Sequence, residues 1–226
     1  MVSKIKAKIS FVKEIAEDSV EVAFTPLEKF EFLPGQYMII DIFKLVTPQK
    51  RTRHFSIASS PDEKEIRIAF RRGFSDFKKF LQDEDNIGQE VTLLGPFGRF
   101  FLPEEKSELV FIAGGIGITP FMDLIPYSLK HNLGHKITLI YTNNSEQRAV
   151  FLKELKELDK KYEDFNLISI IGRADANFIK KHIKNLKAKH FYICGTDAMV
   201  DSVKEILSSE LKIPQEKIHS EGFSGY

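Results

Sequence analysis

The chain has a single cysteine, Cys194, among 226 residues. One thiol excludes an internal disulfide framework and any iron–sulfur or zinc site that needs several cysteines. No apolar run approaches the roughly 20 residues of a membrane-spanning helix, so we expect no membrane insertion. The first residues, MVSKIKAKISFVKEI, alternate and are rich in lysine, without the apolar core of a signal peptide. These absences predict a cytoplasmic protein.

Neither sign of charge dominates, because 33 Lys and Arg side chains stand against 32 Asp and Glu, a formal net charge of +1. Without a global field, neither nucleic acid nor an anionic membrane is expected as a partner. The six histidines are scattered without the spacing of metal ligands, so we expect no metal site. With 42% apolar residues, the chain can bury a good core in one large domain or two ordinary ones.

Up to about residue 103, short β-type segments are separated by turns. Their residues alternate between polar and apolar, or are β-branched and aromatic. Six strands at this spacing favour a small antiparallel barrel. One short helix is predicted among them, with Ser75 as its N-cap. The predicted strands are 5–16, 19–24, 37–43, 54–60, 65–72 and 89–95, and the predicted helix is 76–83.

After residue 103, strands and helices alternate, which is the signature of a parallel, doubly wound sheet. Pro126 is expected to kink or shorten the first helix. Apolar runs predict strands at 108–113, 136–142, 166–172 and 190–195, with helices at 120–131, 146–162, 176–186 and 197–211. The sequence therefore predicts two domains: a Greek-key antiparallel β-barrel over 1–103 and an α/β doubly wound parallel sheet over 104–226.

Glycines mark one strand-to-helix junction, in the stretch FIAGGIGITPF. Gly114, Gly115 and Gly117 allow a sharp turn and a close approach to a bulky anion. Thr119 is a good N-cap, and Pro120 suits the first helical position. Unpaired N–H groups at such a helix start favour a phosphate or pyrophosphate, although a tight turn that binds nothing has the same pattern.

Two segments of the first half also suit a nucleotide. Arg53, Phe55 and Ser56 offer a guanidinium for a phosphate, a stacking face and a hydroxyl for a ring nitrogen. The alternative is a strand start with a solvated arginine and a core phenylalanine. Residues 71–75, RRGFS, form a basic, glycine-containing entry into the short helix that could hold a diphosphate. A capped helix beside solvated charges would have the same sequence.

Six segments resemble, in this order and spacing, the ferredoxin–NADP reductase-like family of FAD- and NAD(P)-binding oxidoreductases. They are RHFSIASS, RRGFS, GPFGRF, AGGIGITPF, ICGTDAM and the terminal EGFSGY, and they extend over nearly the whole chain. The resemblance implies that the barrel binds flavin and the second domain a nicotinamide nucleotide, with hydride passing between them. The implied cofactors are FAD, with FMN less favoured, and NADH or NADPH.

The resemblance also assigns residues to each cofactor. Arg53 would bind the flavin phosphate, Phe55 would lie against the isoalloxazine and Ser56 would address its N5 region. The whole implied cofactor-binding set is Arg53, His54, Phe55, Ser56, Phe70, Arg71, Gly73, Phe74, Ser75, Gly114, Gly115, Gly117, Ile118, Thr119, Pro120, Cys194, Gly195, Phe223 and Tyr226; Ser56, Cys194 and Tyr226 are the implied catalytic residues. The motif departs from many relatives in having Phe55 where they have tyrosine, and its Gly73–Ser75 spacing is one residue shorter than in some.

Three interpretations stay open at the nicotinamide end. Cys194 is small and polarizable enough to touch the nicotinamide, or it is a core cysteine. The terminal aromatics Phe223 and Tyr226 suggest a shield over the flavin that nicotinamide displaces, or a frayed chain end. Arg173 is the best candidate for a 2′-phosphate partner, or it is a solvated loop residue. The choice between NADH and NADPH therefore stays open.

The predicted function is an FAD-dependent NAD(P)H oxidoreductase that passes electrons to a separate acceptor. With one cysteine, this sequence cannot build its own cysteine-ligated cluster. The acceptor would be a ferredoxin, a flavodoxin, a partner subunit or a small molecule. Two alternatives remain: an NAD(P)H:flavin reductase that uses flavin as a diffusible substrate, and a non-catalytic nucleotide-binding subunit that senses redox state.

Overall fold

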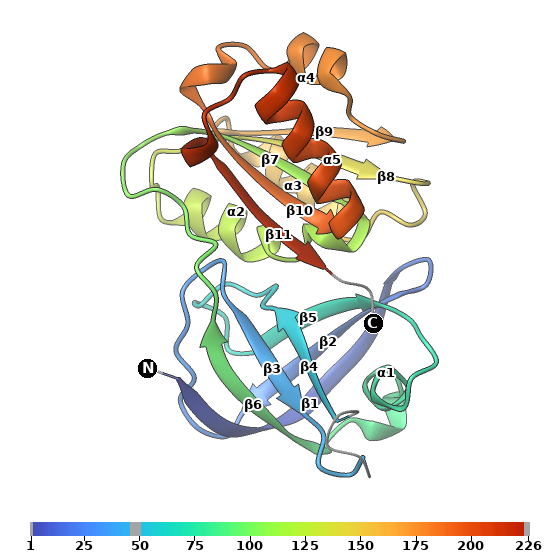
Figure 1. Cartoon of the computed structure of the whole chain (residues 1–226). Coiled ribbons are helices and arrows are strands. Elements are labelled where there is room, and N and C mark those ends of the chain that lie inside the picture. Colours follow the sequence, from blue (N-terminus) through green and yellow to red (C-terminus); the bar gives the residue numbers. More distant parts are fainter. Residues whose placement is uncertain (1, 46–50, 224–226) are drawn as a thin grey trace. The chain divides into compact units, whose positions relative to one another are not determined.

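Two units make up the chain, and each is built around one β-sheet (Figure 1). The computed structural model describes residues 2–45 and 51–223. The first unit comprises Met1–Leu102 and Thr119–Tyr127, and the second comprises Pro103–Ile118 and Ser128–Tyr226. The segment Thr119–Tyr127 therefore packs with the first unit, although its chain neighbours on both sides belong to the second.

The first sheet has six strands, and all neighbouring strands run antiparallel. In sheet order they are β4 (Thr52–Ser56), β3 (Tyr37–Asp41), β6 (Glu90–Phe97), β1 (Ser3–Ala16), β2 (Ser19–Pro26) and β5 (Ile66–Arg71). Just beyond β4, the Ala58 N–H donates to the Arg67 carbonyl at 2.8 Å, which draws the two edge strands together. The predicted antiparallel barrel is confirmed as a sheet curled into a half-barrel (Figure 1).

Alternating burial explains why these segments form strands. Along β1, Ile5, Ala7 and Ile9 are buried while the lysines between them are exposed, which is the period of a strand with one covered face. The predicted short helix is α1 (Asp76–Leu81), and it is followed by the turn η2 (Glu84–Asn86). The Ser75 hydroxyl accepts the Lys78 N–H at 3.3 Å, so Ser75 caps α1 as predicted.

The second sheet has five parallel strands, as the alternating pattern predicted. In sheet order they are β11 (Ile218–Phe223), β10 (His190–Thr196), β7 (Glu108–Gly114), β8 (Lys136–Asn143) and β9 (Phe165–Ile171). From β7 the chain adds β8 and β9 on one side of the sheet, and then adds β10 and β11 on the other side of β7. Strands β7 and β10 are therefore neighbours, and the strand order reverses between them. Strand β11 was not predicted, because its half-buried sequence, IHSEGF, lacks the apolar run of the other four.

Helices cover both faces of the second sheet. Helices α4 (Ala176–His182) and α5 (Asp197–Glu205) share one apolar cluster with β7, β8 and β10. Helix α3 (Leu152–Lys161) contacts β9, and Figure 1 shows α5 in front of the sheet and α3 behind it. Short turns complete the unit: η3 (Gly115–Ile118), η4 (Leu186–Ala188), the π-type turn η5 (Ile206–Glu210) and η6 (Gln215–Lys217).

The helices of the second sheet differ from their predicted extents: α4 ends at His182 rather than at 186, and α5 ends at Glu205 rather than at 211, followed by η5. Helix α2 (Phe121–Lys130) runs through Pro126, so the proline does not shorten it; buried neighbours such as Leu124 and Leu129 hold the turns on either side. Helix α3 begins at Leu152 rather than 146, because Phe151 adopts a left-handed φ of 57°. Within the described ranges, no helix combines the length and apolarity needed to cross a membrane.

Candidate functional site

Strand β4 and helix α1 bring the first predicted motif together. The Arg53 guanidinium carbon lies 5.7 Å from the centroid of the Phe77 ring, and its Nη1 donates to the Thr52 carbonyl at 2.7 Å. Two residues on, the half-buried Phe55 ring stacks on Phe77 at 6.0 Å with an interplanar angle of 18°. Because alternate strand residues share a face, Arg53 and Phe55 both reach the same ring of α1. A cation and an aromatic face therefore lie next to each other.

Ser56 ends β4 and is buried, and its hydroxyl has no hydrogen-bond partner among the described residues. A buried polar group without a partner costs about 1–3 kcal/mol. A ligand atom that bonds this hydroxyl would offset that cost, so Ser56 fits the predicted role toward a flavin ring. His54 is exposed, and its ring lies 5.6 Å from that of Tyr37.

The structure disperses the RRGFS residues. The Arg71 guanidinium donates to the Ser19 hydroxyl at 2.6 Å and to the Glu17 carbonyl at 3.1 Å, at the β1–β2 turn. The Gly73 N–H donates to Gln82 Oε1, and Gln82 Nε2 donates back to the Gly73 carbonyl, each at 3.2 Å. Phe70 is a core residue against Phe55, whereas Phe74 is 93% exposed. Gly73, which is half-buried, and the exposed Phe74 are therefore the residues of this segment that a ligand could still contact.

Lys78 is a cation of this site that the motifs missed. Its side chain lies across Gly73, where an added Cβ would be 2.7 Å from Lys78 Cδ. Burial, and to a lesser degree the nearby Arg53 guanidinium, lowers the pKa of Lys78. The only sequence signal for Lys78 was its position three residues after the capping Ser75. This position does not distinguish a ligand-binding lysine from a solvent-exposed lysine of α1.

The glycine loop of the second unit is tightly packed at the carboxyl ends of β7 and β10. A Cβ on Gly114 or on Gly195 would overlap the Met199 sulfur, and a Cβ on Gly117 would overlap the Cys194 carbonyl. Here the strand order reverses, and in open parallel sheets ligands bind at such a switch point beyond the carboxyl ends. The structure thus brings together predicted glycines from both strands, and it adds Met199, which ends the ICGTDAM segment but was not assigned a role from the sequence.

Hydrogen bonds from β8 hold this loop. The Thr142 hydroxyl donates to the Ala113 carbonyl at 3.1 Å, and the Tyr141 hydroxyl lies 3.1 Å from the Gly115 carbonyl. Ile118 and Thr119 are buried, and the helix that follows Pro120 begins at Phe121. At the end of β8, the Asn143 side chain is 4% exposed, and both of its amide atoms lack a hydrogen-bond partner within the described ranges. Arg173 is exposed in the loop after β9.

Cys194 is fully buried beside a carboxyl group that the sequence motifs did not single out. Burial raises the pKa of its thiol, and the charge of Glu221 raises it further. Glu221 is the register partner of Cys194 on β11, and burial raises its own pKa to about 7. The thiol therefore stays protonated and is no nucleophile near neutral pH. Phe223 pairs with Thr196 at the end of β11, and Tyr226 lies outside the described residues.

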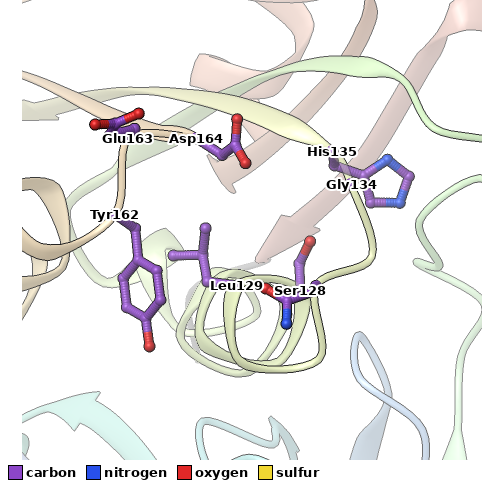
Figure 2. Close-up of a pocket in the computed structure, with 8 residues that line it drawn as sticks. Ser128, Leu129, Gly134, His135, Tyr162, Glu163 and Asp164 are labelled. Carbon is purple, nitrogen blue, oxygen red and sulfur yellow. The ribbon is translucent and has the colours of Figure 1, made fainter.

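A separate cavity of about 60 Å³ lies near the amino ends of β8 and β9, lined by none of the predicted site residues (Figure 2). Figure 2 shows the Ser128 hydroxyl and the Asp164 carboxylate directed into it. In residues 2–45 and 51–223, no three His, Cys, Asp or Glu side chains gather so that they could hold a metal ion. The predicted nucleotide-binding glycines of this unit lie instead at the opposite, carboxyl edge of the sheet.

Comparison with known proteins places this geometry in a class. Residues 111–205 match the oxidoreductase NAD-binding domain family. The chain is 26% identical to the ferredoxin reductase component of 3-ketosteroid-9-alpha-monooxygenase from Mycobacterium tuberculosis, over 88% of this chain and 56% of that protein. It is 25% identical to the electron transfer component of toluate 1,2-dioxygenase from Pseudomonas putida, over 91% of this chain and 63% of that protein. The chain thus spans less than two thirds of these relatives.

Solved structures share the fold over almost the whole chain. The FAD/NAD-binding domain of nitric oxide dioxygenase from Vibrio cholerae has a TM-score of 0.84 at 22% identity, covering 97% of this chain and 98% of that one. Ferredoxin–NADP⁺ reductase from Plasmodium falciparum has a TM-score of 0.82 at 21% identity, covering 97% and 96%. The predicted resemblance is confirmed: the chain has the ferredoxin–NADP reductase-like fold. Within this fold, residues 111–205 are the part that is similar to the oxidoreductase NAD-binding domain family.

Proposed function

We propose that this chain is an FAD-dependent NAD(P)H oxidoreductase that passes electrons to a separate acceptor. Residues 1–103 would form the flavin domain and residues 104–226 the nicotinamide-nucleotide domain. The observation that carries the proposal is the close packing of Gly114, Gly117 and Gly195 at the carboxyl ends of β7 and β10. These glycines lie in the segment that matches the oxidoreductase NAD-binding domain family. The flavin supplies the electron chemistry when bound, and the chain binds and orients both cofactors.

Three residues of β4 support flavin binding in the first unit. Arg53 offers a guanidinium to the phosphate, Phe55 offers an aromatic face beside it, and the unpaired Ser56 hydroxyl offers a bond to the ring system. Together they address the phosphate and the ring system of a flavin nucleotide.

Phe74 supports FAD over FMN. Its ring is 93% exposed and follows Gly73 directly, so a large apolar surface faces solvent at the entry to α1. Stacking of a base on an aromatic side chain contributes about 1–3 kcal/mol. FAD carries an adenine that could cover this ring, whereas FMN carries none. Phe74→Ala should therefore weaken FAD binding and leave FMN binding unchanged.

In the second unit, Gly114, Gly117 and Gly195 let the loop pack closely against Met199 and the Cys194 carbonyl. This packing would fix the loop backbone that holds the nucleotide. Cys194 would contribute a small neutral contact, because burial and Glu221 keep its thiol protonated. Glu221 would be only partly ionised near neutral pH, since burial raises its pKa to about 7. These groups would orient the nicotinamide without placing a full negative charge against it.

The acceptor is proposed from the relatives and from composition. The relatives are named as reductase or electron transfer components of oxygenases. The single cysteine cannot supply the several thiolates of an iron–sulfur cluster, so electrons would leave to a ferredoxin, a flavodoxin, a partner subunit or a small acceptor.

The testing experiment is an anaerobic titration of the purified, flavin-loaded protein with NADH and, separately, with NADPH. Loss of the visible flavin absorbance is expected with at least one nucleotide, and the ratio of the two rates identifies the preferred one. Gly117→Ala should keep the flavin but lose most of this reduction, because its Cβ would overlap the Cys194 carbonyl.

Lys153→Ala is the control, since Lys153 is an exposed residue of helix α3 in the same unit. A protein that neither takes up flavin nor is reduced by either nucleotide would contradict the proposal.

A further inference from the structure

The candidate flavin site holds two cations from different elements. Lys78, on the first turn of α1, is half-buried, and its stem covers Gly73. A Cβ on Gly73 would be 2.7 Å from Lys78 Cδ and 3.4 Å from its Nζ. The glycine therefore makes room for the lysine, and it places the ammonium against the segment that was predicted to hold a pyrophosphate.

Arg53 reaches the same place from β4. Its guanidinium carbon lies 5.7 Å from the ring centroid of Phe77, the residue directly before Lys78. The two positive charges are close enough that Arg53, after burial, is a cause of the lowered pKa of Lys78. Like charges that are partly withdrawn from water repel each other, so an anion close to both would be favoured.

No carboxylate compensates Lys78 in the described part of the chain, where no hydrogen bond or ion pair involves its ammonium. Other lysines differ: Lys6 pairs with Glu90 at 3.3 Å, and Lys189 pairs with Glu108. A phosphate group beside Lys78 and Arg53 would convert their repulsion into two attractions. A lysine has a flexible stem and a compact charge, so its ammonium could pair with a single phosphate or with a diphosphate.

We propose that Lys78 is a phosphate-binding residue of this chain and that it holds, together with Arg53, the diphosphate of FAD or the phosphate of FMN. The inference rests on the proposed function, since it concerns the same flavin site. It adds a ligand that none of the sequence motifs contains, and it assigns Gly73 the role of seating the lysine stem.

The test compares Lys78→Met with wild type in titrations of flavin-free protein with FAD, FMN and riboflavin, followed by flavin fluorescence. Methionine keeps an apolar stem over Gly73 and removes the charge. A charge-assisted hydrogen bond predicts an affinity loss of about tenfold to a hundredfold for FAD and FMN. Riboflavin has no phosphate, so its affinity should change less than about twofold under the same reasoning.

Lys79→Met is the matched control, because Lys79 is the exposed neighbour on the same helix and should leave all three affinities unchanged. The melting temperature of flavin-free Lys78→Met should equal or exceed that of wild type, since removing one cation relieves repulsion. Unchanged FAD and FMN affinities, or an equal loss for riboflavin, would overturn the role of Lys78 alone. A wild-type protein that binds none of the three flavins would overturn the proposed function as well.

Discussion

Asp123 Oδ2 accepts a hydrogen bond of 2.8 Å from the backbone N–H of Gly35, 88 residues earlier in the chain. Both lie in the first unit, and the Asp123 side chain is fully buried. Gly35 has a φ of 88°, and a Cβ there would overlap the Phe100 carbonyl. This bond therefore attaches the start of α2, directly after the glycine loop, to the turn that precedes β3.

Asp123→Ala should destabilise the protein, because it leaves the buried Gly35 N–H without an acceptor. The expected loss is about 1–3 kcal/mol in the free energy of unfolding, measured by urea denaturation. Asp123→Asn keeps a carbonyl oxygen at this position and should lose less. Equal stability of Asp123→Ala and wild type would show that water or another group replaces the bond.

Gly114→Ala should weaken nucleotide binding, because its Cβ would overlap the Met199 sulfur and displace the glycine loop. Since the sulfur is near the end of a flexible side chain, the double variant Gly114→Ala/Met199→Ala should regain part of the lost nucleotide affinity. The measurement is a double-mutant cycle on the Kd for NADH or NADPH. Strictly additive effects would contradict a direct contact between these residues.

Asn143→Leu should raise the melting temperature of the nucleotide-free protein by a few degrees. The reason is that both Asn143 amide atoms are buried without a partner in the described residues, and an apolar isostere removes that desolvation cost. If the amide serves the nucleotide, the same variant should raise the KM for NADH or NADPH. Thermal unfolding and steady-state kinetics test the two halves separately, and a lower melting temperature would contradict the first.

Mild acid should destabilise the second unit through its histidines. His190 Nδ1 and His219 Nε2 lie 3.3 Å apart, and burial lowers the pKa of both rings below 6.5. The unfolded chain then binds more protons near pH 6.5, so the stability that these rings contribute is present above this pH and is lost as pH falls through their lower folded pKa values.

Thermal unfolding between about pH 7.5 and about pH 5 measures this effect. His219→Gln should flatten the pH dependence, because it removes one of the two coupled rings. A variant with the full wild-type slope would contradict the assignment.

Glu221 predicts the opposite slope. Burial raises its pKa from 4.5 to about 7, so the folded protein binds a proton that the unfolded chain has already released. Its contribution to stability is fully present below about pH 4.5 and is lost as pH rises through about 7. Glu221→Gln should therefore gain melting temperature over wild type at about pH 8 and gain little at about pH 5. A gain of equal size at both pH values would point to a cause other than ionisation.

Local pattern was sufficient for most elements. The alternation of β1 and the cap at Ser75 predicted a strand and a helix that the structure confirms, because both depend on neighbouring residues. Strand β11 escaped prediction because its stability comes from pairing with β10 rather than from its own apolar content. Lys78 and Glu221 escaped because their environments are made by β4 and β10, which are distant in sequence.

By itself, the sequence determined the succession of strands and helices and the glycine-rich turn at Gly114, since periodicity, caps and backbone freedom are properties of adjacent residues. Only the tertiary structure decided which distant groups meet: Asp123 with Gly35, and Arg53 with Phe77. The physical reason is that such contacts depend on how the elements pack, and burial then sets the charge and bonding of each group. The chemistry of this protein depends on those contacts.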